Sequence, residues 1–297
     1  MKGLKIKGEL LMGESLSNHT FLRLGGKAKY FLFANNAEDI IKAITFSYRE
    51  GIPNYIIGKG SNVLFLDEGF SGLIITTERM DEIVLEEDKI RAQAGATLNH
   101  LINCAKEASL SGIESLVDIP GSIGGASVMN AGAFECEIGD WIIAASVLRD
   151  GKVQRLTNIN FGYRESSLTN EIVLEVELLL KEEEREKIEK KIQKAKELRK
   201  ISQPELSVRM GTCGSVFKNP EGFSAGKLIE KAGLKGKRIG GAEISRKHGN
   251  FILTSPSSSS NDVVNLIRLV KDEVRKILGI NFETEVVIVG KEKEIQI

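Results

Sequence analysis

The sequence has few cysteines and no net charge. Its three cysteines, Cys104, Cys136 and Cys213, form no C-x-x-C pair. Their spacing fits neither a metal site nor a disulfide framework, so we predict no metal and a reducing cytoplasm. The 41 basic residues balance 41 acidic ones, which argues against a nucleic-acid or polyanion binder. We expect a small molecule or another protein as the partner, and the oligomeric state stays open, a monomer included.

Membrane and secretion signals are also missing from the sequence. The longest apolar run, WIIAASVL, is far shorter than the roughly 18 residues that a membrane helix needs. Within the first 15 residues, Lys5, Lys7 and Glu9 interrupt the apolar residues, so we expect no signal peptide. No G-x-x-x-x-G-K-[ST] motif occurs, and Gly58 and Gly60 lack the third glycine of the dinucleotide fingerprint.

The 297 residues are 41% hydrophobic, which favours about two domains with sizeable cores. The apolar pattern predicts helices over 37–52 and 97–110, the first with Asn36 as its cap. Strands are expected at 54–58, 73–77, 89–95, 141–156 and 171–180, with a tight turn at Asp150-Gly151. The residues expected to face the core are Ile40, Ile41, Ile44 and Tyr48 in the first helix, and Leu98, Leu101, Ile102 and Ala105 in the second.

Two further helices are expected in the second half of the chain. The charged stretch 181–200 has Ile188, Ile192, Ala195 and Leu198 at helical spacing, which predicts a surface helix at a domain boundary, without chemistry of its own. The smaller α+β unit that follows contains a helix over 263–278, preceded by the capping sequence SPSSSSND. Its predicted core-facing stripe is Val263, Leu266, Ile267, Val270, Val274 and Ile277.

Two stretches concentrate glycine and small polar residues. They are IGKGSNVLF, residues 57–65, and IPGSIGGASVMNAGAF, residues 119–134. Glycine lets the backbone approach a ligand closely, and successive N–H groups in such turns can form an anion nest. Each stretch taken alone is more often a tight structural turn. Together they favour a large phosphate-bearing ligand.

Seven blocks then occur in one order: NHTFLRLGGKAKYF, IGKGSNVLF, IPGSIGGASVMNAGAF, FGYRESS, GSVFKNP, GLKGKRIGGAEISRKHGNFI and FETEVVIVG. With these blocks the chain resembles the UDP-N-acetylenolpyruvoylglucosamine reductase family over residues 17–290. The resemblance implies an α+β (α/β) fold, with a two-subdomain FAD-binding module of the vanillyl-alcohol-oxidase type and a smaller C-terminal α+β substrate domain. The boundaries expected are 1–75, 76–200 and 201–297. Only one strand fits between Arg164 and the charged helix, as in the shorter family type without an extra substrate-gating loop.

The resemblance also implies cofactors: non-covalent FAD, and NADPH as the hydride donor. The residues that it assigns to FAD are Ile57, Gly58, Gly60, Ser61, Asn62, Pro120, Gly121, Ser122, Gly124, Asn130 and Gly132. The family reduces an enolpyruvyl ether of a UDP-sugar during peptidoglycan synthesis, so the expected partner is a UDP-sugar. The residues implied at the substrate are Tyr163, Lys218, Asn219, Glu243 and His248.

Three residues are expected to carry the chemistry. Hydride addition leaves a carbanion beside a carboxylate, which needs a hydrogen-bonding or cationic partner and then a proton. The fork of Arg164 suits the carboxylate, Glu285 matches the family's catalytic glutamate, and Ser215 suits proton donation. Their ordinary alternatives are a surface ion pair, an outward-facing strand residue and a turn residue, respectively.

The sequence departs from the family pattern near the implied substrate site. It reads RMGTCGS before the GSVFKNP block, Glu243 where glutamine is common, and Thr254 where asparagine is common. Two rival functions stay open. One is a carbohydrate flavin oxidase on the same FAD module, and the other is a non-catalytic FAD- or nucleotide-binding sensor.

Overall fold

A computed structural model describes residues 5–297, so the first four residues of the segment examined for a signal peptide lie outside the described residues. The chain forms two compact units. Unit 1 holds Phe31–Lys59, Leu73–Arg199 and the described residues before Met12; unit 2 holds Met12–Tyr30, Gly60–Gly72 and Lys200–Ile297. Residues 12–30 and 60–72 thus group with the C-terminal residues, and the three-part division of the sequence stays a prediction.

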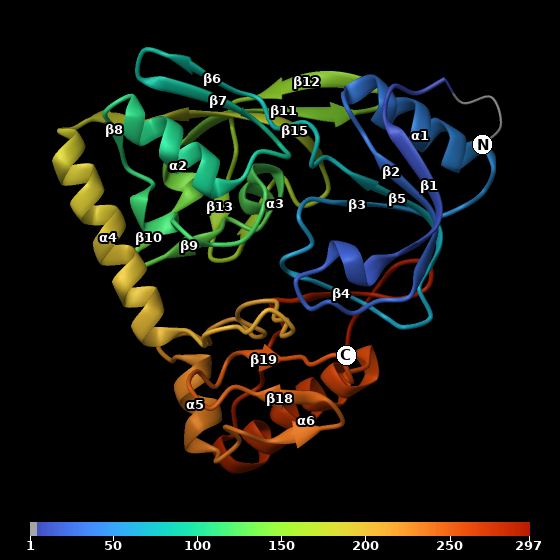
Figure 1. The fold of residues 1–297 in the computed structure, drawn as a ribbon, viewed down its shortest axis with the longest axis vertical. Helices are drawn as coiled ribbons and strands as arrows, with labels where there is room; N and C mark the ends of the chain where they lie inside the picture. Colours follow the sequence, from blue (N-terminus) through green and yellow to red (C-terminus); the bar gives the residue numbers. More distant parts are fainter. Residues whose placement is uncertain (1–4) are drawn as a thin grey trace. The chain divides into compact units, whose positions relative to one another are not determined.

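The largest sheet of unit 1 is antiparallel, with the strand order β12-β11-β15-β7-β6 (Figure 1). Its strands are β6 (Ile83–Glu86), β7 (Lys89–Gln93), β11 (Ile142–Arg149), β12 (Lys152–Leu156) and β15 (Ile172–Leu179). The predicted turn joins β11 to β12, with positive φ at Asp150 (51°) and Gly151 (70°). Positive φ at both positions matches the right-handed twist of the flanking strands, and this explains the Asp-Gly pair.

The inner face of this sheet forms the core of unit 1. Helices α2 (Leu98–Glu107) and α3 (Ile123–Val128) cover it (Figure 1). The predicted inward residues of α2 are all buried against Ile90 and Ala92 of β7 and Val176 of β15. Thr97 caps α2 by accepting a hydrogen bond from the His100 N–H at 3.1 Å.

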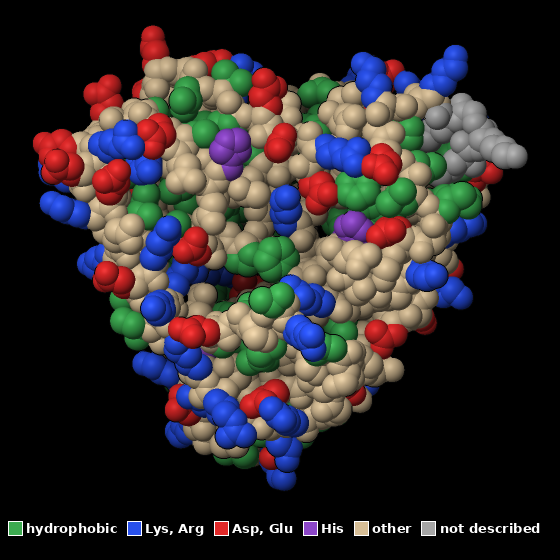
Figure 2. Space-filling model, in the orientation of Figure 1, with side chains coloured by type: hydrophobic (Ala, Val, Ile, Leu, Met, Phe, Trp, Pro, Cys, Tyr) green, Lys and Arg blue, Asp and Glu red, His purple; other side chains and the backbone are tan. Residues whose placement is uncertain are grey.

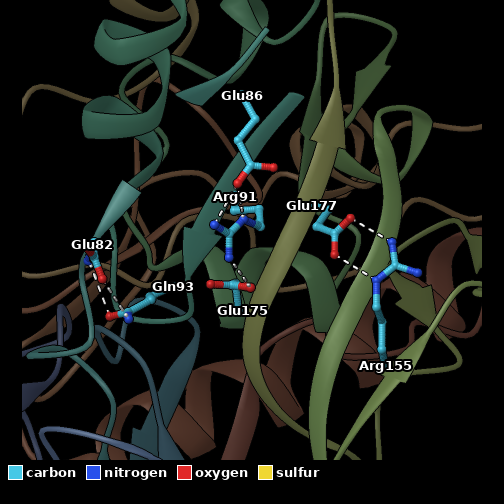
Figure 3. A network of polar contacts seen from close by, with 7 residues as sticks. All are labelled: Glu82, Glu86, Arg91, Gln93, Arg155, Glu175 and Glu177. Atoms are coloured by element: carbon cyan, nitrogen blue, oxygen red, sulfur yellow. Dashed lines mark hydrogen bonds and ion pairs between the residues drawn. The ribbon is translucent and has the colours of Figure 1, made fainter. Parts of the chain in front are cut away.

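The outer face of the same sheet carries charged side chains from neighbouring strands (Figure 3). Arg91 pairs with Glu86 at 2.7 Å and with Glu175 at 3.8 Å, while Arg155 pairs with Glu177 at 2.7 Å. Alternation along each strand places these residues opposite the core residues. Exposed pairs of this kind contribute little stability, so the sheet depends on its inner face.

A second sheet has the order β1-β2-β5-β3. Its strands are β1 (Glu9–Ser15), β2 (Lys27–Phe33), β3 (Asn54–Ile57) and β5 (Phe70–Thr76), and β3 and β5 are parallel. Helix α1 (Ala37–Arg49) begins as predicted, because the Asn36 side chain accepts from the Asp39 N–H. Ile40 is buried as predicted, and Ile41 and Ile44 are partly buried. The prediction for Tyr48 is wrong: Tyr48 is 89% exposed, and Ala43 and Phe46 complete the buried stripe. The buried stripe runs at spacings of three, which carries position 48 away from the core.

Unit 2 contains two small sheets and two helices. The elements are β4 (Val63–Phe65), α5 (Ala225–Lys231), β17 (Arg238–Ile239), β18 (Ala242–Ile244), β19 (Ile252–Leu253), α6 (Ser260–Leu278), β20 (Val287–Val289) and β21 (Glu294–Ile295). Strand β4 pairs in parallel with β20, which places Val63 beside Val287. This pairing is the reason why residues 60–72 group with the end of the chain.

Helix α6 provides much of the unit 2 core. Ser259 and Asp262 form a capping box at its start, and Gly279 ends it in the left-handed conformation, with φ of 71°. The predicted stripe is buried except for Ile277, which is 50% exposed. That one prediction is wrong, because Ile277 lies in the last turn, beyond Val274, the final buried residue.

The remaining elements are short. They are η1 (Leu16–His19), β8 (Leu110–Ser111), η2 (Glu114–Leu116), β9 (Gly132–Ala133), β10 (Cys136–Glu137), η3 (Ile138–Asp140), β13 (Phe161–Gly162), β14 (Glu165–Ser166) and β16 (Lys181–Glu182). The two-residue strands β14 and β16 add to the single strand expected between Arg164 and the charged helix. On the face drawn in Figure 2, basic and acidic side chains are interspersed, in keeping with the balanced composition.

The charged helix, α4 (Arg185–Ser202), has a buried stripe that includes a charge. Ile188, Ile192 and Ala195 are buried as predicted, but Leu198 is 38% exposed and Arg199 is 8% exposed. The Arg199 Nε donates to the Val117 carbonyl at 2.7 Å, and its Nη2 donates to the Ser115 carbonyl at 3.0 Å. Burial lowers the pKa of this guanidinium, which nevertheless stays charged.

We predict that Arg199→Lys destabilises the protein by roughly 1–3 kcal/mol, because an ammonium cannot bond both carbonyls as the planar fork does. Chemical unfolding would measure the loss. Arg185→Lys is the matched control: its side chain is 50% exposed on the same helix, so a change within about 0.5 kcal/mol is expected. Equal losses in the two variants would contradict a special role for Arg199.

Candidate active site

The start of the first glycine cluster contacts the second cluster inside unit 1. Gly58 directly follows β3, and a Cβ added there would lie only 2.0 Å from the Ser122 Oγ. Only glycine lets the two segments approach this closely. Ile57, at the end of β3, is buried and anchors the turn.

The second cluster is fixed by its backbone. The Ile123 N–H donates to the Ala96 carbonyl at 2.8 Å, and the Gly124 N–H donates to the Ala94 carbonyl at 2.9 Å. Ser122 caps α3, and Gly121 has φ of 155°. Pro120 lies exposed just before this turn. The segment is therefore held in one conformation, as a binding loop requires.

Asn130 is buried, its φ is 44°, and its side chain makes hydrogen bonds to several segments. Its Nδ2 donates to the Gly162 carbonyl at 2.8 Å and to the Glu137 Oε2 at 2.5 Å, and its Oδ1 accepts from the Gly139 N–H at 3.0 Å. The side chain thus joins three segments of unit 1. A contact between Asn130 and FAD stays a prediction, and these bonds give its amide a structural role.

Residues around Asn130 orient the guanidinium of Arg164. Its Nη2 donates to the Gly132 carbonyl at 2.8 Å and its Nη1 to the Asn130 carbonyl at 3.3 Å, and Nη1 lies 3.4 Å from the Glu137 Oε1. The guanidinium also lies over the ring of the partly exposed Tyr163, 5.0 Å from its centroid. Arg164 has φ of 58°, a costly conformation for a residue with a Cβ. Such strain is often stored at functional sites.

Glu137 was missed by the sequence analysis. It pairs with Arg164 and also accepts from Asn130. The only sequence signal was a carboxylate just after the second glycine cluster, and many surface glutamates share that setting. Its role depends on a contact across 27 residues of chain.

In unit 2, a predicted cofactor residue is bonded to a predicted catalytic residue. The Asn62 Nδ2 donates to the Glu285 carbonyl at 2.9 Å, and the Val287 N–H donates to the Asn62 carbonyl at 3.1 Å. Gly60 has φ of 64°, and a Cβ added there would lie 2.0 Å from the His19 carbonyl oxygen. Residues 60–62, Ser61 among them, therefore form a tight turn bonded to the segment that carries Glu285, just before β20.

Ser215 and Lys218 lie at the two ends of a segment that is hydrogen-bonded to residues 283–286, just before β20. The Glu285 N–H donates to the Val216 carbonyl at 2.8 Å, and the Lys218 N–H donates to the Glu283 carbonyl at 2.9 Å. The Lys218 Nζ also pairs with the Glu283 carboxylate at 2.7 Å. Unit 2 therefore brings Ser215, Lys218 and Glu285 onto paired backbone segments.

The other predicted substrate residues have protein partners. The Asn219 Oδ1 accepts from the Ala225 N–H at 2.9 Å, at the start of α5. Glu243 pairs with Arg238 across the β17–β18 hairpin and with Arg246 at 3.2 Å.

His248 is partly buried, and its Nδ1 accepts from the Asn250 N–H at 3.2 Å. Burial is the main cause that lowers the pKa of His248. Contacts between these residues and a substrate stay predictions.

The thiols do not supply a nucleophile. Burial raises the pKa of Cys213 to about 12 and that of Cys136 to about 11, so both are protonated at neutral pH. Among residues 5–297, no three His, Cys, Asp or Glu side chains are grouped so as to hold a metal ion. No helix in that range is both long and apolar enough to span a bilayer.

Comparison with known proteins defines the class. The sequence profile of the FAD binding domain matches residues 28–157, and that of the UDP-N-acetylenolpyruvoylglucosamine reductase C-terminal domain matches residues 203–289. The chain is therefore an FAD-dependent oxidoreductase with a mixed α and β fold, which confirms the predicted fold class and the FAD cofactor.

The similarity to individual proteins shows the family to which the chain belongs. A UDP-N-acetylenolpyruvoylglucosamine reductase from Thermotoga maritima is 40% identical, over 93% of this chain and 98% of that protein. One from Exiguobacterium sibiricum is 38% identical, over 96% and 95%. A solved structure of the reductase from Thermus caldophilus has a TM-score of 0.81 at 34% identity, over 96% of this chain and 99% of that chain. The chain belongs to the UDP-N-acetylenolpyruvoylglucosamine reductase family, as the seven blocks predicted.

Within each unit, residues of the glycine clusters have the bare backbone that an FAD pyrophosphate requires. At Gly58 and Gly60 an added Cβ would collide with a neighbouring oxygen at 2.0 Å, and Gly121 has a φ that favours glycine. Such turns present backbone without side chains, which is what close approach to a phosphate needs.

We predict that Gly58→Ala weakens FAD binding by roughly tenfold or more, because its Cβ must displace Ser122. The ratio of flavin to protein absorbance after dialysis would measure retention. Gly51→Ala is the matched control in unit 1: Gly51 has φ of 62° and nothing within 4 Å of an added Cβ. It should cost about 1–2 kcal/mol of stability and retain FAD. Full retention by Gly58→Ala would contradict the assignment.

Proposed function

We propose that this chain reduces the enolpyruvyl ether of UDP-N-acetylglucosamine enolpyruvate, giving UDP-N-acetylmuramate for peptidoglycan synthesis. The observation that carries the proposal is membership of the reductase family across both the FAD binding domain and the C-terminal domain. NADPH as the electron donor and a cytoplasmic location belong to the same proposal. The resemblance supports NADPH, and the cysteine usage supports the cytoplasmic location.

FAD is proposed to bind along the two glycine clusters. The residues that would hold it are Ile57, Gly58, Gly60, Ser61, Asn62, Pro120, Gly121, Ser122 and Gly124, with Asn130 and Gly132 beside them. Bound FAD would supply the two-electron chemistry, taking a hydride from NADPH and giving one to the substrate.

Arg164 is proposed to bind the substrate carboxylate. As the neighbouring CH2 becomes CH3, negative charge spreads from the adjacent carbon into that carboxylate as an enediolate. A guanidinium binds such a planar group with two hydrogen bonds and keeps its charge. Because its contacts with Asn130, Gly132 and Glu137 already orient Arg164, little ordering is left for the moment of reaction.

Ser215 is proposed to donate the proton that completes the reduction. A hydroxyl is a weak acid, but the carbanion is a base strong enough to accept from it. Glu285, in its protonated form, is proposed to donate a hydrogen bond to the enediolate. Lys218 is proposed to bind the substrate phosphates or to stabilise the serine alkoxide. The Lys218–Glu283 pair then requires Lys218 to exchange one anionic partner for another.

The visible spectrum of the purified protein tests this function against its rivals. We predict flavin absorbance that NADPH bleaches and that the enolpyruvyl substrate restores under anaerobic conditions. A carbohydrate oxidase would be bleached by a sugar and restored by oxygen. A protein that only binds FAD would not bleach with NADPH, and that result would contradict the proposed activity.

For the serine, we predict that Ser215→Ala separates the two half-reactions. NADPH should bleach the flavin at the wild-type rate, because that step needs no serine proton. Reoxidation by the enolpyruvyl substrate should slow by roughly a hundred- to ten-thousand-fold, the usual range for loss of a general acid. Stopped-flow absorbance of the flavin follows both steps.

Ser215→Cys is the control for geometry, because a thiol donates a proton from nearly the same place and should keep part of the activity. Wild-type reoxidation by Ser215→Ala would remove Ser215 as the proton donor. Loss of flavin reduction instead would assign it to the other half-reaction.

A further inference from the structure

Asn250 bonds both backbone groups of one residue in the GSVFKNP block. Its Oδ1 accepts from the Phe217 N–H at 2.9 Å, and its Nδ2 donates to the Phe217 carbonyl at 2.8 Å. Asn250 is 3% exposed, so neither bond competes with bulk water. The side-chain amide therefore replaces the peptide group of a neighbouring strand.

The backbone of Asn250 extends the same contact. Its carbonyl accepts from the Val216 N–H at 2.9 Å, and its N–H donates to the His248 Nδ1 at 3.2 Å. Residue 251 then bridges to Ser215 in an antiparallel sense. Residues 215–217 are thus held along one edge by Asn250 and Phe251.

The other edge of the segment faces residues 283–286, which include Glu285 and lie just before β20. The Glu285 N–H donates to the Val216 carbonyl at 2.8 Å, and an antiparallel bridge joins Phe217 to Thr284. Glu285 and its neighbours fix one edge of the segment. If the hydrogen bonds to Asn250 on the other edge were lost, the 216–217 peptide could rotate, and this rotation would shift the backbone of Ser215.

We propose that Asn250 is the positioning residue for Ser215, holding its backbone at the place from which the hydroxyl donates a proton. This inference rests on the proposed role of Ser215. An amide is required because the site needs one donor and one acceptor side by side. Aspartate offers only acceptors at neutral pH, and its second oxygen would face the Phe217 carbonyl.

The test uses the FAD-loaded enzyme with Asn250→Asp, and Asn265→Asp as the matched control on the exposed face of α6. Both half-reactions, FAD content and unfolding are measured. We expect Asn250→Asp to keep FAD and wild-type bleaching by NADPH, but to reoxidise roughly ten- to a hundredfold more slowly with the enolpyruvyl substrate. Asn265→Asp should match wild type. A merely structural role would lower FAD content and both half-reactions together.

A double-mutant cycle with Ser215→Ala decides whether Asn250 acts through the serine. We expect Asn250→Asp to slow the Ser215→Ala enzyme by much less than it slows wild type. Fully additive losses, or no loss from Asn250→Asp, would overturn the inference. If Asn250→Asp does not fold, Asn250→Ala removes both bonds without burying a charge and enters the same cycle. If Ser215→Ala itself reoxidises normally, the proposed serine chemistry fails instead, so the two failures are distinguishable.

Discussion

The hydrogen bonds on both edges of Val216 hold the unit 2 part of the proposed site together. Val216 donates to Asn250 on one side and accepts from Glu285 on the other. Asn62 is bonded to Glu285 in turn, so a predicted cofactor residue, a predicted catalytic residue and the segment of Ser215 share one hydrogen-bond network. Such a network fixes positions to within a few tenths of an ångström at low conformational cost, which catalytic geometry demands.

In unit 1, the residues around Arg164 are positioned by strained backbone conformations. Asn130, Phe134, Glu135 and Arg164 all have positive φ values, between 44° and 63°. Each costs free energy, which buried hydrogen bonds such as those of the Asn130 amide offset. The result is an arginine whose direction is set by backbone carbonyls and one carboxylate.

Local patterns in the sequence predicted much of the fold. The Asn36 cap, the inward face of α2 and the Asp150-Gly151 turn depend on neighbouring residues, and all are confirmed. Tyr48 and Ile277 were assigned to the core because period alone cannot say where a stripe ends. Arg199 was missed because its partners, the carbonyls of residues 115 and 117, lie more than 80 residues away in the chain.

For the site, the ordered blocks predicted the family, and the glycine clusters predicted a phosphate-bearing ligand. Glu137 and Asn250 could not be found in this way. Their importance lies in tertiary contacts with Arg164 and Phe217, respectively, and neither residue type is unusual in its local sequence.

The pairing of β4 with β20 has a consequence for how the protein is made. Val63 and Val287 are partners although most of the chain lies between them. Closing so long a loop costs entropy before any contact offsets it, and contacts of this kind slow folding. On the ribosome, β4 emerges early and must wait for nearly the whole chain before its partner exists. Unit 1, whose last residue is Arg199, can be complete while β4 still lacks its partner, so the edge of β4 stays unpaired until the last part of unit 2 is made.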